Sequence, residues 1–174
     1  MTLTVDLHDR VEEIEGYREE IRQEAAEIDP DDRGSAEAKQ LEDEYEELGK
    51  SLDTLREKIE EYGGSEFEIK EGKWGDQGRI NDRVRADTLN DGLDDPRAKE
   101  DALRIHTVQV LVCSTPPDAP TEAKEYPPVI GQFLWEKADA YNRLGDVDGG
   151  PGNSLWEDLE TSTSNKQRDS STED

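Results

Sequence analysis

Cysteine and histidine are almost absent from this sequence. Cys113 is the single cysteine among 174 residues, and His8 and His106 are the two histidines. One cysteine cannot form a disulfide within the chain, and the two histidines do not have the spacing of metal ligands. We therefore expect no metal site and no cofactor. Cys113 follows an apolar run, residues 108–112, and we expect it to be a small core residue.

Basic and apolar residues are also scarce. The chain has 21 Lys and Arg against 46 Asp and Glu, a formal net charge of −25, and only 30% hydrophobic residues. Such a surface repels nucleic acid and anionic membranes, so we expect neither as a partner. No run approaches 18 apolar residues and no signal-peptide pattern is found, which predicts a cytoplasmic protein. Because the acidic residues occur throughout the chain, the composition is typical of proteins that work in molar salt, where charges are strongly screened.

The motifs of common catalytic and ligand sites are missing as well. The sequence has no glycine-rich phosphate loop, no nucleophilic serine on a tight turn and no calcium-binding loop. Paired carboxylates are frequent, but with 46 acidic residues they carry little information. We therefore expect no catalytic residues and a protein that is not an enzyme.

The clearest positive signal is a heptad repeat in two stretches of the first 62 residues, in which apolar residues alternate at spacings of three and four. Pro30 and Gly34 break the helix between the stretches, and Ser35 is a natural N-cap for the second helix. The pattern predicts an antiparallel two-helix coiled-coil hairpin over residues 1–62. Its seam comprises Leu7, Val11, Ile14, Ile21 and Ile28 in the first helix and Leu41, Tyr45, Leu48, Leu52, Leu55 and Ile59 in the second.

A turn centred on Arg33 brings the two seams into register. It places Ala25 opposite Leu41, and it places Arg18 opposite Leu48, where we expect the Arg18 stem to pack and its charged head to stay in solvent. Gly16 and Gly49 fall nearly opposite one another and favour a close approach or a bend of the helices. Two interpretations of the hairpin remain open: a rigid spacer or self-association device, and a docking arm for a specific target.

Residues 63–145 predict a small helical domain. Phe67 and Ile69 alternate with polar residues, which indicates one short extended segment. Asp76 and Asp95 are expected to cap two helices, and a last helix is expected after the proline-rich loop 114–128. Residues 105–112 fit the end of a buried helix or a strand. The predicted fold class is therefore mainly all-α, followed by an acidic disordered tail over residues 146–174.

Four aromatic residues of this domain are candidates for a partner surface: Trp74, Phe133, Trp135 and Tyr141. Phe133 and Trp135 cannot both face the same stripe of the last helix, so we expect an exposed aromatic side chain to mark a binding site. The alternative is that all of these rings belong to the core of a domain that is short of aromatics.

Residues 65–145 resemble small tail assembly chaperones of tailed viruses. The resemblance lies in the order of EFEIKEGKWGDQGRINDRV, DALRIHTVQVLV and YPPVIGQFLWEKADAYNRLGD, with Phe67, Ile69, Lys70 and Glu71 matching the opening segment of that family. It implies a short extended segment followed by a compact helical domain. The implied role is non-enzymatic: such chaperones cover the hydrophobic helix of the tape-measure protein and are absent from the mature virion. With the acidic composition, the source would be a virus or provirus of a halophilic archaeon.

Two other functions remain open beside the chaperone. One is a structural virion protein of the tail or connector, and the other is a halophilic coiled-coil adaptor protein. Each implies protein partners, among them a tape-measure protein or tail components in the viral cases, and the hairpin is also compatible with a homo-oligomer.

Overall fold

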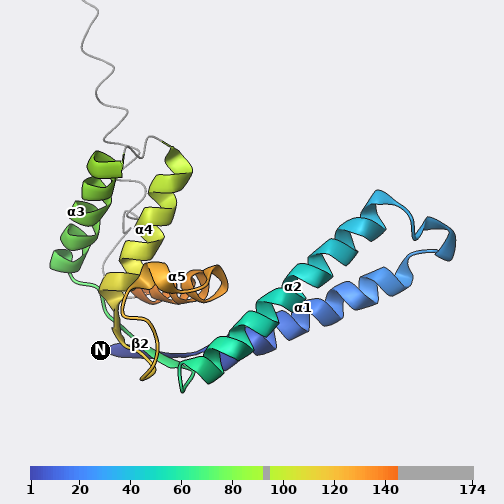
Figure 1. Ribbon diagram of the computed structural model, residues 1–174, viewed down its shortest axis with the longest axis horizontal. Coiled ribbons are helices and arrows are strands. Elements are labelled where there is room, and N and C mark those ends of the chain that lie inside the picture. The colour runs from blue at the N-terminus through green and yellow to red at the C-terminus, as the bar shows by residue number, and fades with distance from the viewer. Residues whose placement is uncertain (92–94, 145–174) are drawn as a thin grey trace, which may run out of the picture.

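A computed structural model describes residues 1–91 and 95–144 of the chain and shows a mainly helical protein with one small sheet (Figure 1). The predicted fold class is confirmed. The elements in chain order are β1 (Thr2–Asp6), α1 (Leu7–Glu27), the 3₁₀ helix η1 (Pro30–Asp32), α2 (Ala36–Glu61), β2 (Glu66–Lys70), α3 (Trp74–Asp91), α4 (Pro96–Leu111), β3 (Val112–Ser114), the 3₁₀ helix η2 (Ala123–Glu125) and α5 (Pro128–Leu144). The predicted tail at 146–174 lies outside the described residues.

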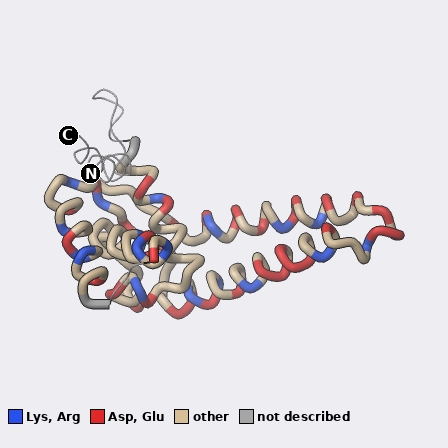
Figure 2. Tube along the Cα trace, turned by 90° about the horizontal axis from the view of Figure 1, so that it is seen from above, with Lys and Arg blue, Asp and Glu red and all other residues tan. Residues whose placement is uncertain are grey.

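Helices α1 and α2 form the predicted antiparallel hairpin, which projects from the rest of the protein as a long arm (Figures 1 and 2). Each helix begins at a capping side chain. The Asp6 carboxylate accepts a hydrogen bond of 2.9 Å from the backbone N–H of His8, and the Ser35 hydroxyl accepts one of 3.1 Å from Ala38. These caps satisfy N–H groups that have no partner within the helix, so they define where α1 and α2 start.

The heptad seam lies between the two helices, as the spacing predicts. None of its eleven residues is exposed, and the buried members are Leu7, Ile14, Ile21, Leu41, Leu52 and Leu55. The half of the seam near the sheet also packs against the core of the globular part, where Leu7 and Leu55 contact the same cluster as Phe67 and Phe133. One continuous core therefore runs across the end of α2, where the sequence predicts a domain boundary.

The sheet has three antiparallel strands in the order β1-β2-β3. Strand β2 is the extended segment predicted from Phe67 and Ile69. Strand β1 was not predicted, although Leu3 and Val5 alternate with polar residues; in the sheet they lie opposite Ile69 and Phe67. A five-residue strand at a chain end depends on a partner more than sixty residues away, so its local pattern carries little weight.

Residues 105–112 end a helix and begin a strand. Helix α4 continues to Leu111, and β3 starts at Val112. This arrangement overturns the expectation that Cys113 is a core residue, because Cys113 is exposed and its thiol donates a hydrogen bond of 3.3 Å to the carbonyl of Glu68. Successive side chains of a strand point to opposite faces, so Val112 is half-buried and Cys113 points outward.

Helix α3 starts earlier than predicted. It begins at Trp74, and Asp76 lies at its third position, where its carboxylate reaches back to accept a hydrogen bond of 3.1 Å from the N–H of Lys73. The same carboxylate accepts a bond of 2.8 Å from the Lys70 ammonium and lies 3.0 Å from the Arg79 guanidinium. Asp76 was expected to be the N-cap residue of this helix. Instead it lies inside the first turn and accepts a hydrogen bond from the N–H of the residue before the helix, as the acidic residue of a capping box does.

Candidate interaction surface

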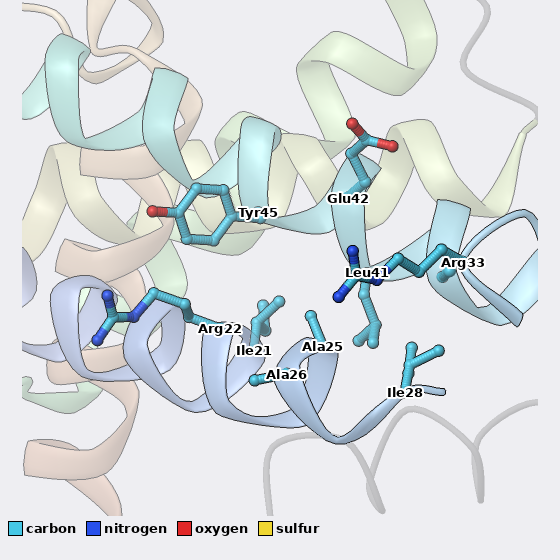
Figure 3. Close-up of a pocket in the computed structure, with 10 residues that line it drawn as sticks. Ile21, Arg22, Ala25, Ala26, Ile28, Arg33, Leu41, Glu42 and Tyr45 are labelled. Carbon is cyan, nitrogen blue, oxygen red and sulfur yellow. The ribbon is translucent and has the colours of Figure 1, made fainter. Parts of the chain in front are cut away.

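The two helices of the hairpin leave an open groove between them at the end farthest from the sheet (Figure 3). We call it the tip groove, and its volume is about 400 Å³. Its lining is mostly apolar, with charged groups at its edges. The lining residues are Ile21, Arg22, Ala25, Ala26 and Ile28 from the first helical stretch, Arg33 from the turn, and Ala38, Leu41, Glu42 and Tyr45 from α2.

Small side chains keep this end of the seam open. Ala25 is exposed, although the predicted register buries it against Leu41, and Ile28 and Ala38 are only half-buried. An alanine contributes a single methyl group, so the alanines of α1 and α2 cannot fill the space between the two helices. The expectation of a closed seam at Ala25 is therefore wrong, and apolar surface that a coiled coil normally buries remains accessible.

Tyr45 forms the inner limit of the tip groove, and Arg18 stacks on its ring. The guanidinium carbon of Arg18 lies 4.0 Å from the centroid of the Tyr45 ring, and its Nε is buried without a hydrogen-bond partner. A Cβ added at Gly49 would lie 3.3 Å from Nη2 of Arg18. Arg18 is half-buried as a whole: its guanidinium stacks on the Tyr45 ring beside Gly49, and it also lines an open depression next to Glu15 and Glu19.

On the side of Tyr45 that faces away from the tip, the space between the helices is lined mainly by charged side chains. A second depression of about 170 Å³ is lined by Tyr45 and Leu52 together with Glu15, Arg18, Glu19 and Arg56. There Arg56 and Glu15 form an ion pair that joins α2 to α1. The hairpin is therefore bridged by charges in its middle and open and apolar at its tip.

The four predicted partner-binding aromatics lie in different environments. Trp74 is 92% exposed at the start of α3, as a partner contact requires. Phe133 is 1% exposed and belongs to the core, so its prediction as a binding residue is wrong. Trp135 and Tyr141 are half-buried and pack against that core, and Arg104 lies 4.9 Å above the Trp135 ring. The fold does not bring these four rings together into one surface.

Both histidines have carboxylate neighbours. The Nδ1 atom of His8 lies 2.9 Å from Asp6 and 3.0 Å from the hydroxyl of Ser65. A Ser-His-Asp triad needs the serine and the aspartate on opposite ring nitrogens, whereas here both contact the same one. His106 Nε2 lies 2.5 Å from Asp87 and connects α4 to α3. The contact between His8 and Asp6 lies at the N-terminal cap of α1, and the contact between His106 and Asp87 joins two packed helices, so both have a structural explanation.

The described part of the chain carries no arrangement of metal ligands. No group of three or more His, Cys, Asp or Glu among residues 1–91 and 95–144 is placed to hold a metal ion. Within the same ranges, no helix is long and apolar enough to cross a membrane.

Several residues of the tip groove were not predicted as binding residues, namely Ala26, Arg22, Arg33 and Glu42. The groove could have been predicted from the sequence, because Ala25 and Ala38 occupy seam positions at which larger side chains normally close a two-helix coiled coil. Comparison of the chain with protein-family models, curated proteins and solved structures finds no match.

Proposed function

We propose that the protein is a non-enzymatic assembly chaperone or adaptor that binds a helix of another protein in the tip groove. The observation that carries this proposal is the open half of the seam, in which Ile28 and Ala38 are half-buried and Ala25 is exposed. An amphipathic helix lying along a groove of this kind is a common mode of protein recognition.

The groove suits a helix in length and chemistry. From Ile21 to Ile28 the first helical stretch presents about two turns, roughly 10 Å, and α2 presents the same length from Ala38 to Tyr45. A third helix would complete a small bundle and cover side chains that are now in contact with water. Full burial of an isoleucine or leucine side chain contributes about 1.5–3 kcal/mol, so two or three new contacts of this kind support a specific but reversible complex.

The specific form that we propose is a tail assembly chaperone, in line with the resemblance of residues 65–145. Its partner would then be the hydrophobic helix of a tape-measure protein, and the projecting acidic arm would keep that helix in solution. Mass spectrometry of purified virions separates this role from that of a structural virion protein, because a chaperone is absent from the finished particle. A coiled-coil adaptor would bind a helix without any link to tail assembly.

The binding function is tested with a synthetic amphipathic helix about three heptads long, with leucine at the a and d positions and glutamine at the flanking positions. Fluorescence anisotropy should detect its binding to the full chain. Ala25→Phe fills the groove and should abolish binding. The control is Ala36→Phe, because Ala36 is exposed on α2 outside the groove and should tolerate the ring. Absence of binding, or equal binding by the two variants, would refute the proposal.

A further inference from the structure

The two edges of the small sheet are built differently. Strand β3 forms one edge: it has three residues, its register with β2 shifts between Glu68 and Ile69, and Pro116 and Pro117 follow it. Short length, irregular pairing and proline all hinder the addition of a further strand. Strand β1 forms the other edge; it has five residues in regular register with β2 and contains neither proline nor lysine. Only the β3 edge is therefore protected against strand pairing.

The hydrogen bonds at the end of β1 show which of its backbone groups face β2. The N–H of Leu7 donates a hydrogen bond of 2.9 Å to the carbonyl of Ser65, which continues the register of the two strands. Hydrogen-bonded and non-bonded pairs alternate along an antiparallel ladder. Counting back from Leu7, the residues of β1 that bond to β2 are Val5 and Leu3.

The remaining backbone groups of β1 point away from the sheet. Thr2 and Thr4 direct both their N–H and their C=O outward, and Asp6 directs its N–H outward while its C=O belongs to the first turn of α1. Among residues 1–91 and 95–144, no backbone or side-chain group forms a hydrogen bond with the outward groups of Thr2 and Thr4. The side chains of both threonines are exposed as well. The edge therefore offers a row of free donors and acceptors.

A second copy of β1 is complementary to this row. Two identical strands can pair antiparallel about a twofold axis, the symmetry of most dimers. With Thr4 opposite Thr4 of the second copy, the two residues exchange N–H···O bonds in both directions. Thr2 then lies opposite Asp6 of the second copy, whose N–H can donate to the Thr2 carbonyl. On the core side of the sheet, the half-buried Leu3 lies beside Val5 of the second copy and gains an apolar neighbour.

The charge of this edge suits a like chain. Residues 1–5 contain no ionisable side chain, although 39% of the residues in the chain are charged. The register places Asp6, the acidic residue of β1, opposite Thr2 of the second copy and not opposite another acid. Each copy still has a net charge of −25, so repulsion between the whole chains opposes pairing at low salt and is screened in molar salt.

From these observations we propose that two copies of the chain form a dimer by antiparallel pairing of their β1 strands, which joins their two three-stranded sheets into one. A pair of five-residue strands buries less surface than a permanent interface, so the dimer is in equilibrium with the monomer. The tip groove lies at the end of the hairpin farthest from the sheet, so this pairing leaves it open in both copies. The inference is thus independent of the proposed function.

Sedimentation equilibrium of the full chain at several protein concentrations tests the dimer. Dissociation should be weaker at about 1 M salt, where the Debye length is about 3 Å, than at about 0.1 M, where it is about 10 Å. Thr4→Pro removes an outward N–H without loss of a bond to β2, and it should abolish the dimer. The matched control is Thr4→Val, which keeps the N–H and a β-branched side chain and should keep the dimer. Circular dichroism confirms native helicity for both variants.

Disulfide formation tests the register. The background is Cys113→Ser, because Cys113 is exposed. Thr4→Cys should then form a disulfide between two copies, since the Cα atoms of a hydrogen-bonded pair lie about 5.5 Å apart, within the range of a disulfide. Thr2→Cys is the matched control. Its two copies would lie roughly 14 Å apart along the paired strands and should not form a disulfide.

The outcomes are distinct from those for the tip groove. A chain that stays monomeric at every concentration and salt would overturn the inference, whether or not the groove binds a helix. A dimer that Thr4→Pro leaves unchanged would overturn it as well, because another surface would then hold the copies together. Removal of the dimer by Ala25→Phe and not by Thr4→Pro would place that surface in the groove. Equal disulfide formation by Thr4→Cys and Thr2→Cys would exclude the pairing of the two β1 strands.

Discussion

Replacement of Asp76 by asparagine should weaken the attachment of α3 to the rest of the protein. Asp76 is only 4% exposed, and its carboxylate connects three groups: the ammonium of Lys70 in β2, the backbone N–H of Lys73 and the guanidinium of Arg79. Helix α3 packs mainly on α4, and the contact between Asp76 and Lys70 is a direct connection of α3 to the sheet. Asparagine keeps the shape and one acceptor oxygen but loses the negative charge.

The expected loss follows from these contacts. A hydrogen bond to a charged group contributes about 1.5–3 kcal/mol. The Arg79 side chain is 67% exposed, so its ion pair adds little. Because asparagine still accepts one bond, we expect the free energy of unfolding to fall by about 1–3 kcal/mol. For a protein of this size, each kcal/mol lowers the melting temperature by roughly 2–4 °C.

The loss should depend on pH. The hydrogen bond from Lys70, then that from the Lys73 N–H, lowers the pKa of Asp76 below its ordinary value of 3.8. A carboxylate with a lowered pKa in the folded state stabilises the protein above the unfolded-state pKa, and this contribution is lost as the pH falls through the folded-state pKa. The difference between wild type and Asp76→Asn should therefore be full at pH 7 and shrink once the pH falls below about 4.

Thermal unfolding followed by circular dichroism between pH 7 and pH 3 measures this difference, and hydrogen exchange should show faster exchange in α3. The matched control is Asp82→Asn, an exposed carboxylate on the same helix, which should change stability by less than about 0.5 kcal/mol. Equal melting temperatures for the two variants at pH 7 would refute the reasoning. So would a difference between wild type and Asp76→Asn that stays the same at every pH.

Three further predictions concern the hairpin and the core. Leu55→Ala, at a position with 0% exposure, should lower the free energy of unfolding by about 2–5 kcal/mol in urea denaturation; a loss below about 1 kcal/mol would contradict its core position. Burial raises the pKa of Tyr126 to about 12, so in a spectrophotometric titration Tyr126→Phe should remove the part of the tyrosine absorbance change that appears near pH 12. Burial also raises the pKa of Tyr62, whose late ionisation should remain in the variant. Because the folded-state pKa of Tyr126 is raised, its contribution to stability holds below pH 10 and is lost as the pH rises through about 12. Gly16→Ala should stabilise the hairpin by about 0.5–1 kcal/mol, because nothing lies within 4 Å of the added Cβ. Gly49→Ala should stabilise it less, because the added Cβ would contact Arg18. Equal gains of the two variants in thermal melts would contradict a cost of the Arg18 contact.

The hairpin was predictable from the sequence because its signals are local. The seam residues repeat every three and four positions, and Pro30, Gly34 and Ser35 mark the end of one helix and the start of the next. A heptad pattern already specifies which side of each helix is apolar. The predicted β2 segment and the start of α4 at Pro96 also rest on local signals and agree with the structure.

The candidate site was only partly predictable. Trp74 is exposed as proposed, but Phe133 is a core residue, and the tip groove was not identified as a binding site. Whether an aromatic residue on α5 faces the core depends on which element packs beside it. In the same way, the groove depends on the distance between α1 and α2 at Ala25 and Ala38. The spacing of apolar residues along one helix carries no information about that distance.

By itself, the sequence determined the helical character of the protein, the apolar side of each hairpin helix and the excess of negative charge, because propensity, periodicity and charge belong to short stretches of chain. Only the tertiary structure decided that Leu3 pairs with Ile69, that Arg18 stacks on Tyr45 and that the seam stays open at the tip. These features arise from residues far apart in the sequence, and their geometry depends on how completely the side chains between two elements fill the space.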